Sequence, residues 1–152
     1  MDLRNADEVF RAYAEIEGRL GRRYKGLAVK VQKMVRGGHE VILGMTRDPQ
    51  YGPLLMFGLG GIHVEVLKDV AVRVHPITDV QAREMITSIR GHALLAGARG
   101  EPASDLATLE SCLLRLSALV GSFDEIQEID VNPLIVGKKR GQSLIVDARV
   151  RV

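Results

Sequence analysis

The residues of this chain best suited to chemistry are three oxygen donors near its C-terminal end, Asp130, Asn132 and Asp147. Asp130 and Asn132 are two positions apart in a segment typical of a strand, so their side chains share one face. Asp147 belongs to a second extended segment, which follows a basic turn over residues 137–141. We expect the two segments to pair as a hairpin, which would bring the three side chains together.

Carboxylate and amide oxygens in this arrangement suit a magnesium site. Mg²⁺ prefers a few hard oxygen ligands and fills its other positions with water and phosphate oxygens. The alternative is a purely structural role, in which Asn and Asp near strand ends form hydrogen bonds with nearby backbone groups, as both residue types do at turns. The spacing alone leaves both interpretations open.

The elements around these residues indicate an α+β domain. Apolar residues at helical spacing predict helices over residues 5–20, 78–89 and 104–120, the last ended by Gly121. The expected caps are Asn5 with Glu8, Thr78 with Gln81, and Ser104 or Asp105. Two-residue alternation predicts strands over residues 27–35 and 62–66. Further β-rich segments between turn residues predict strands over residues 40–46, 54–57, 71–74, 126–136 and 143–146. The glycine-rich segments 58–61 and 91–100 are predicted to be loops. Tight connections between strands favour antiparallel pairing.

Composition is that of an ordinary globular domain. Of the 152 residues, 46% are hydrophobic and 26% are charged. The longest uncharged apolar stretch, residues 51–62, is too short to span a bilayer and is interrupted by glycine and proline. The first residues, MDLRNADEV, lack the basic and apolar regions of a secretory signal. We therefore expect a cytoplasmic protein with no membrane partner.

Seven basic residues between positions 19 and 36 have no acid among them. They are Arg19, Arg22, Arg23, Lys25, Lys30, Lys33 and Arg36. Such a run can hold a polyanion, but Tyr24 is its only aromatic residue and the segment matches no nucleic-acid-binding module. A solvated face, or a face near nucleotide phosphates, is the favoured interpretation, and no nucleic-acid partner is expected.

The metal-site motif resembles a known family. The sequence EIDVNPLIV at 128–136, followed by LIVDARV at 144–150, resembles the end of the ATP-grasp module in ADP-forming acetyl-CoA synthetases and succinyl-CoA synthetase β chains. The resemblance implies that Asn132 and Asp147 bind the Mg²⁺ of the nucleotide. Upstream, VKVQKMVRGGHEVILG at 29–44 resembles the strand that links the two ATP-grasp lobes, and FGLGGIHVEVLKDV at 57–70 resembles the family's glycine loop and next strand.

The same resemblance implies the residues that would contact ATP or ADP. Gln32 stands near the adenine amino group, Lys33, Met34 and Val35 offer backbone groups in the hinge, and Glu40 matches a nucleotide-contacting glutamate suited to the ribose hydroxyls. Relatives often carry glutamate in place of Gln32. The glutamine keeps a carbonyl acceptor, which leaves the choice between adenine and guanine open.

The implied architecture is an ATP-grasp C-terminal lobe, an antiparallel sheet with flanking helices, plus part of an N-terminal lid. Residues 1–28 would form the partial lid, and residues 29–152 the lobe that binds nucleotide and Mg²⁺. In relatives, a phosphate-binding lysine and a histidine loop come before the segment that matches Leu3 to Val9. We therefore expect a fragment or one piece of a split enzyme, not active alone.

The implied function is part of an ADP-forming acyl-CoA synthetase, which converts acyl-CoA, ADP and phosphate into acid, CoA and ATP through phosphohistidine. The expected partners are the remaining synthetase domains or subunit, which bind CoA and carry the phosphohistidine. The four histidines, at positions 39, 63, 75 and 92, match none of the family's phosphohistidine positions, so no catalytic residue is assigned. The alternative is a noncatalytic docking or regulatory module built on the same scaffold.

Overall fold

The computed structural model describes residues 2–20, 28–61 and 69–152. The predicted strand over residues 62–66, His63, and three of the basic residues, Arg22, Arg23 and Lys25, lie outside these ranges. The chain divides into two compact units, Met1–Arg36 and Gly37–Val152. Each unit is described by itself.

The smaller unit contains one helix, α1 (Ala6–Leu20). As predicted, Asn5 caps it: the Oδ1 of Asn5 accepts a hydrogen bond from the backbone N–H of Glu8 at 3.0 Å. The Glu8 carboxylate in turn accepts from the backbone N–H of Arg4 at 2.7 Å. Two otherwise unpaired backbone donors at the start of the helix are thereby satisfied.

The strand predicted over residues 27–35 is wrong for the residues described, because 28–36 form neither helix nor strand. Alternating apolar residues produce a strand only where a neighbouring strand supplies hydrogen-bond partners. The strands that the structure describes all belong to the larger unit, Gly37–Val152.

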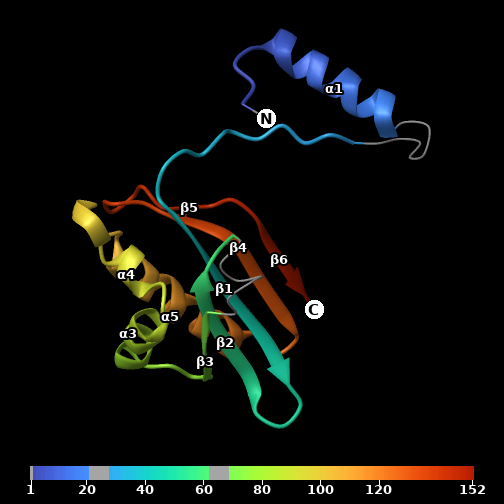
Figure 1. Cartoon of the computed structure of the whole chain (residues 1–152). Helices are drawn as coiled ribbons and strands as arrows, with labels where there is room; N and C mark the ends of the chain where they lie inside the picture. Colours follow the sequence, from blue (N-terminus) through green and yellow to red (C-terminus); the bar gives the residue numbers. More distant parts are fainter. Residues whose placement is uncertain (1, 21–27, 62–68) are drawn as a thin grey trace. The chain divides into compact units, whose positions relative to one another are not determined.

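The larger unit is built on one antiparallel sheet (Figure 1). Its strands are β1 (His39–Asp48), β2 (Gly52–Leu59), β3 (Val70–Val74), β4 (Glu128–Val136), β5 (Leu144–Ile145) and β6 (Ala148–Arg151). The order is β3-β2-β1-β4, and β5 and β6 both pair with β4. The central strands β1 and β4 are therefore consecutive in space although about 80 residues apart in sequence, which makes their pairing non-local.

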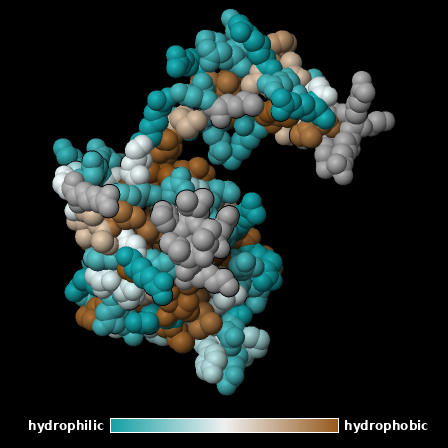
Figure 2. All heavy atoms as spheres, in the orientation of Figure 1, coloured by the Kyte–Doolittle hydropathy of each residue, from teal (hydrophilic) through white to brown (hydrophobic). Residues whose placement is uncertain are grey.

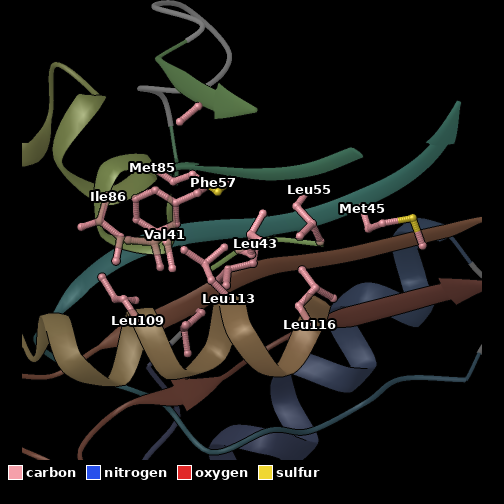
Figure 3. Packing of buried hydrophobic residues seen from close by; sticks show 14 of the residues in the cluster. Val41, Leu43, Met45, Leu55, Phe57, Met85, Ile86, Leu109, Leu113 and Leu116 are labelled. Atoms are coloured by element: carbon pink, nitrogen blue, oxygen red, sulfur yellow. The ribbon is translucent and has the colours of Figure 1, made fainter. Parts of the chain in front are cut away.

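Helices cover one face of this sheet. They are α3 (Asp79–Ser88), the one-turn α4 (His92–Leu95), a 3-10 turn (Ala98–Gly100) and α5 (Leu106–Ser122). Side chains from alternate positions of β1 and β2 pack against α3 and α5 (Figure 3). The labelled members of this core are Val41, Leu43, Met45, Leu55, Phe57, Met85, Ile86, Leu109, Leu113 and Leu116.

The opposite face of the sheet, here called the open face, carries residues that alternate with the core positions. A shallow pocket of about 340 Å³ lies on it. Its lining includes Gly44, Thr46, Leu54, Met56, Val72, Glu128 and Asp130. Hydrophilic and apolar residues are interspersed over the visible surface of each unit (Figure 2).

Both predicted caps of the larger unit's helices are confirmed. Thr78 and Gln81 form a capping box at α3, with hydrogen bonds of 3.2 and 2.9 Å. Asp105 caps α5 and accepts hydrogen bonds from Thr108, from the hydroxyl at 2.6 Å and the backbone N–H at 3.1 Å. These bonds hold the pKa of the Asp105 carboxyl below its usual value.

The predicted end of the third helix at Gly121 is off by one residue, since α5 continues to Ser122. Two further glycine-based predictions are wrong. Gly58 belongs to β2, so the predicted loop is shortened to Gly60 and Gly61. The segment 91–100 contains α4 and the 3-10 turn and is not a plain loop.

None of the helices described is long and apolar enough to cross a bilayer.

Candidate functional site

Asn132 and Asp147 lie directly opposite each other. The register of β4 pairs Val131 with Ala148 and Leu134 with Ile145, which places Asn132 against Asp147. The backbone N–H of Asn132 donates to the carbonyl of Asp147 at 3.0 Å. Side chains that oppose each other in an antiparallel pair share a face, with Cβ atoms about 5 Å apart. The predicted hairpin is therefore confirmed, with Asp147 between β5 and β6.

Strand β4 has a β-bulge at Asn132. The register between β1 and β4 shifts between Val41 and Leu43, so that Asn132 and Pro133 together oppose Ile42. Bulges of this kind bend a strand locally and redirect side chains, and they are frequent next to active sites. Asp130, two residues before Asn132, lines the open-face pocket. Asp130, Asn132 and Asp147 thus come from adjacent strands onto the same face, as predicted.

Asn132 and Asp147 leave room for the other ligands of a bound metal ion. Both Asn132 and Asp147 are exposed, and the Asp147 side chain keeps 55% of its accessible surface. The described residues contain no group of three or more His, Cys, Asp or Glu side chains placed to hold a metal. One carboxylate and one amide oxygen suit Mg²⁺ only if phosphate and water complete its octahedron. This donor set fits a metal that arrives with a nucleotide.

Glu40 lies at the start of β1, next to the glycine turn. By the two-residue period of β1 it shares the open face with Gly44. The N–H of Gly60 donates to the carbonyl of Glu40 at 2.7 Å, and a Cβ at Gly60 would lie 2.9 Å from the Glu40 Cβ. Any larger residue at position 60 would therefore push Glu40 aside. Glu40 and Gly60 both line a pocket of about 400 Å³. Its lining residues are Gly38, His39, Glu40, Leu59, Gly60, Gly61 and Leu94.

A nearly buried carboxylate, that of Asp69, lies directly before β3. Asp69 is 9% exposed, and its two oxygens accept the backbone N–H groups of Arg90 and Gly91, each at 2.7 Å. Charge-assisted bonds of this length are among the stronger hydrogen bonds in proteins. Gly91 has no space for a side chain, because a Cβ would lie 2.0 Å from the Leu59 Cδ1. Asp69 therefore holds the segment between α3 and α4 against Leu59, next to the glycine turn.

The predicted hinge residues belong to the smaller unit. Gln32, Lys33 and Met34 are exposed and Val35 is half-buried. Gln32 and Met34 line a groove of about 840 Å³ beside α1. Their contacts with a nucleotide, like that of Glu40, stay predictions.

Two of the described histidines, His39 and His75, each lie within hydrogen-bond distance of a serine hydroxyl. The Nδ1 of His39 lies 2.9 Å from the Oγ of Ser104, and the Nδ1 of His75 lies 3.0 Å from the Oγ of Ser117. Both serines are buried. Cys112 packs against the core, and burial raises the pKa of its thiol.

Two residues of this region were missed by the sequence analysis. Arg149 lies on β6 with its Nε 3.8 Å from the Oδ2 of Asp147. Its position two residues after Asp147 on a strand was a usable signal. Asp69 gave no such signal, because its partners at positions 90 and 91 are distant in sequence.

Comparison with known proteins gives consistent matches. The whole chain, residues 1–152, matches the ATP-grasp domain family. It is 43% identical over 155 residues to the β subunit of the ADP-forming acetate–CoA ligase II of Pyrococcus furiosus, covering 99% of this chain and 65% of that one. It is 42% identical to the ADP-forming 4-hydroxybutyrate–CoA ligase of Nitrosopumilus maritimus, covering 99% of this chain and 22% of the ligase.

A solved structure matches as well. The dinucleotide-forming acetyl-coenzyme A synthetase 1 of Candidatus Korarchaeum cryptofilum, in complex with coenzyme A and Mg-AMPPCP, superposes with a TM-score of 0.84 at 37% identity. The match covers 99% of this chain and 65% of that chain. The predicted α+β fold, an antiparallel sheet with flanking helices, is thereby confirmed. The chain belongs to the ATP-grasp family and resembles the part of it found in ADP-forming acyl-CoA synthetases.

Proposed function

We propose that this chain is the nucleotide- and Mg²⁺-binding part of an ADP-forming acyl-CoA synthetase. The synthetase would convert acyl-CoA, ADP and phosphate into the free acid, CoA and ATP by way of a phosphohistidine. The observation that carries the proposal is the placement of Asn132 opposite Asp147 on the open face. Their oxygens would hold the Mg²⁺ that accompanies ATP or ADP.

The relatives support this reading. The Pyrococcus relative is named an ADP-forming acetate–CoA ligase subunit. The Korarchaeum structure contains coenzyme A and Mg-AMPPCP, with a phosphohistidine segment pointing towards the nucleotide binding site. Because the relatives named above are acyl-CoA ligases and synthetases, a noncatalytic docking or regulatory module is not favoured.

Each predicted residue has a defined task in this proposal. Bound Mg²⁺ supplies charge neutralisation at the phosphates, on which phosphoryl transfer largely depends. Asn132 and Asp147 hold that ion in place, and Glu40 accepts hydrogen bonds from the ribose hydroxyls. Gln32 accepts from the base, while residues 33–35 offer backbone groups.

The proposal also covers the domain division of the chain and its partners in the synthetase. Residues 1–28 act as part of the lid and residues 29–152 as the lobe that binds nucleotide and metal. The partners are the remaining synthetase domains or subunit, which bind CoA and carry the phosphohistidine, and the assembly works in the cytoplasm. This is in keeping with the 65% of the Pyrococcus subunit that the chain covers.

Calorimetry tests the proposal. Mg-ADP and Mg-ATP are titrated into the chain, alone and together with the rest of the synthetase. We expect binding that is strongly weakened when EDTA removes the Mg²⁺, because the site offers the phosphates little positive charge without metal. If the completed synthetase binds no nucleotide, the proposed nucleotide-binding function is rejected, and a noncatalytic docking or regulatory module becomes the favoured alternative.

A further inference from the structure

One cation stands beside the candidate metal ligands. Arg149 on β6 lies directly opposite Asp130 on β4, so the two side chains share the open face with Asn132 and Asp147. The Nε of Arg149 is 3.8 Å from the Oδ2 of Asp147. Arg149 and Asp130 also line a common depression of about 250 Å³. The guanidinium therefore forms a loose ion pair with Asp147 and lies on the strand position opposite Asp130.

The net charge of the group formed by Asp130, Asp147 and Arg149 changes sign when a divalent metal ion binds. Asp130, Asp147 and Arg149 together carry −1 (two negative charges and one positive), and a bound Mg²⁺ would change that to +1. The ion pair is loose and well solvated, because the Arg149 side chain is 80% exposed. Exposed ion pairs of this kind are weak, so a divalent ion can displace the guanidinium from Asp147. A guanidinium set free there matches the geometry of phosphate oxygens, to which it can donate two parallel hydrogen bonds.

We propose that Arg149 is the exchangeable countercharge of the metal site. Before metal binds, it pairs with the Asp147 carboxylate; once Mg²⁺ takes Asp147, it turns to the phosphates of the nucleotide. Arg149 thus competes with free metal but assists the metal–nucleotide complex. The inference rests on the proposed function, since it takes Asn132 and Asp147 as the metal ligands.

This exchange predicts two effects of opposite sign. In Arg149→Gln, Mn²⁺ used alone as the probe should bind about threefold to tenfold more tightly, because a like charge beside the ion is gone. Mg-ADP should bind about tenfold more weakly, because a charged hydrogen bond to phosphate is lost. Arg149→Lys keeps the charge without the planar fork, so it should bind Mn²⁺ as the wild type does and Mg-ADP with intermediate affinity.

The chain offers a matched control. Arg151 lies two residues along β6 on the same face, and its Nε donates to the Oε2 of Glu128 at 3.1 Å. Arg151→Gln removes the same charge farther from Asp147, so it should change neither affinity by more than about twofold. Both arginine side chains are largely exposed, and matching thermal melts of the two variants would show that both are folded.

Mn²⁺ binding is measured by the electron paramagnetic resonance signal of the free ion, and Mg-ADP binding by calorimetry, on the full chain with the rest of the synthetase present. Tighter Mn²⁺ and weaker Mg-ADP binding in Arg149→Gln alone supports the exchange. Unchanged affinities, or equal shifts in Arg149→Gln and Arg151→Gln, overturn it while leaving the proposed function intact. A wild type that binds neither probe rejects the proposed function and this inference with it.

Discussion

Replacing Asp147 with asparagine is expected to weaken the binding of Mg-ADP by at least about 100-fold, since loss of even an outer-shell partner of a metal ligand costs 10- to 100-fold. The variant keeps the size of the side chain but removes the negative charge from one of the two predicted ligands. Because Asp147 is exposed and its backbone carbonyl still accepts from Asn132, the fold should be unaffected. Calorimetric titration with Mg-ADP measures the effect, and a thermal melt confirms folding.

Asp124→Asn is the matched control for this variant. Asp124 precedes β4, and its side chain is 98% exposed. The same charge is removed from the same unit, but away from the hairpin, so the affinity for Mg-ADP should stay near the wild-type value. Equal losses in the two variants would mean that net charge, and not coordination by Asp147, governs binding.

Replacing Leu113 with alanine is expected to lower the free energy of unfolding by about 2–5 kcal/mol. Leu113 is fully buried on α5, where it packs toward β1 (Figure 3). The truncation removes apolar contacts and leaves a cavity between helix and sheet, which close-packed neighbours fill only in part. Urea denaturation followed by circular dichroism gives the change.

Leu119→Ala is its counterpart on the same helix. The Leu119 side chain is 40% exposed, so the same substitution should cost much less, about 1 kcal/mol or below. A Leu113 variant no less stable than the Leu119 variant would contradict the packing of α5 against β1.

Local signals predicted much of the fold. The capping boxes of Asn5 with Glu8 and of Thr78 with Gln81 mark helix starts because the bonds involved join residues three apart. The β-rich composition of residues 40–46, between turn residues, predicted most of β1, in which Val41, Leu43 and Met45 face the core. In each case the signal lies in residues close together along the chain.

The errors come from positions whose conformation depends on distant residues. The segment 91–100 contains the short helix α4, whose Leu95 is fully buried, although its glycines predicted a loop. Gly58 stays in β2, where the two flanking strands β1 and β3 pair with it. Residues 28–36 alternate in polarity but form no strand, because alternation alone does not supply the hydrogen-bond partners that a strand needs.

The candidate site was predicted in part for the same reasons. Asn132 and Asp147 were found from a two-residue period and a hairpin, and the register places them face to face. Their use as metal ligands came from family resemblance, because spacing alone does not separate a ligand from a turn residue. Asp69 was missed because its partners, Arg90 and Gly91, are distant in sequence, whereas Arg149 could have been found from its position two residues after Asp147.

Anomalous diffraction from crystals grown with Mn²⁺ and AMPPCP, with the rest of the synthetase present, tests the assignment of the metal ligands most directly. We predict one manganese peak at about 2.2 Å from both the Oδ1 of Asn132 and a carboxylate oxygen of Asp147, with phosphate oxygens completing the shell. A nucleotide-bound manganese ligated by other residues, with Asn132 and Asp147 free of the ion, would contradict the account.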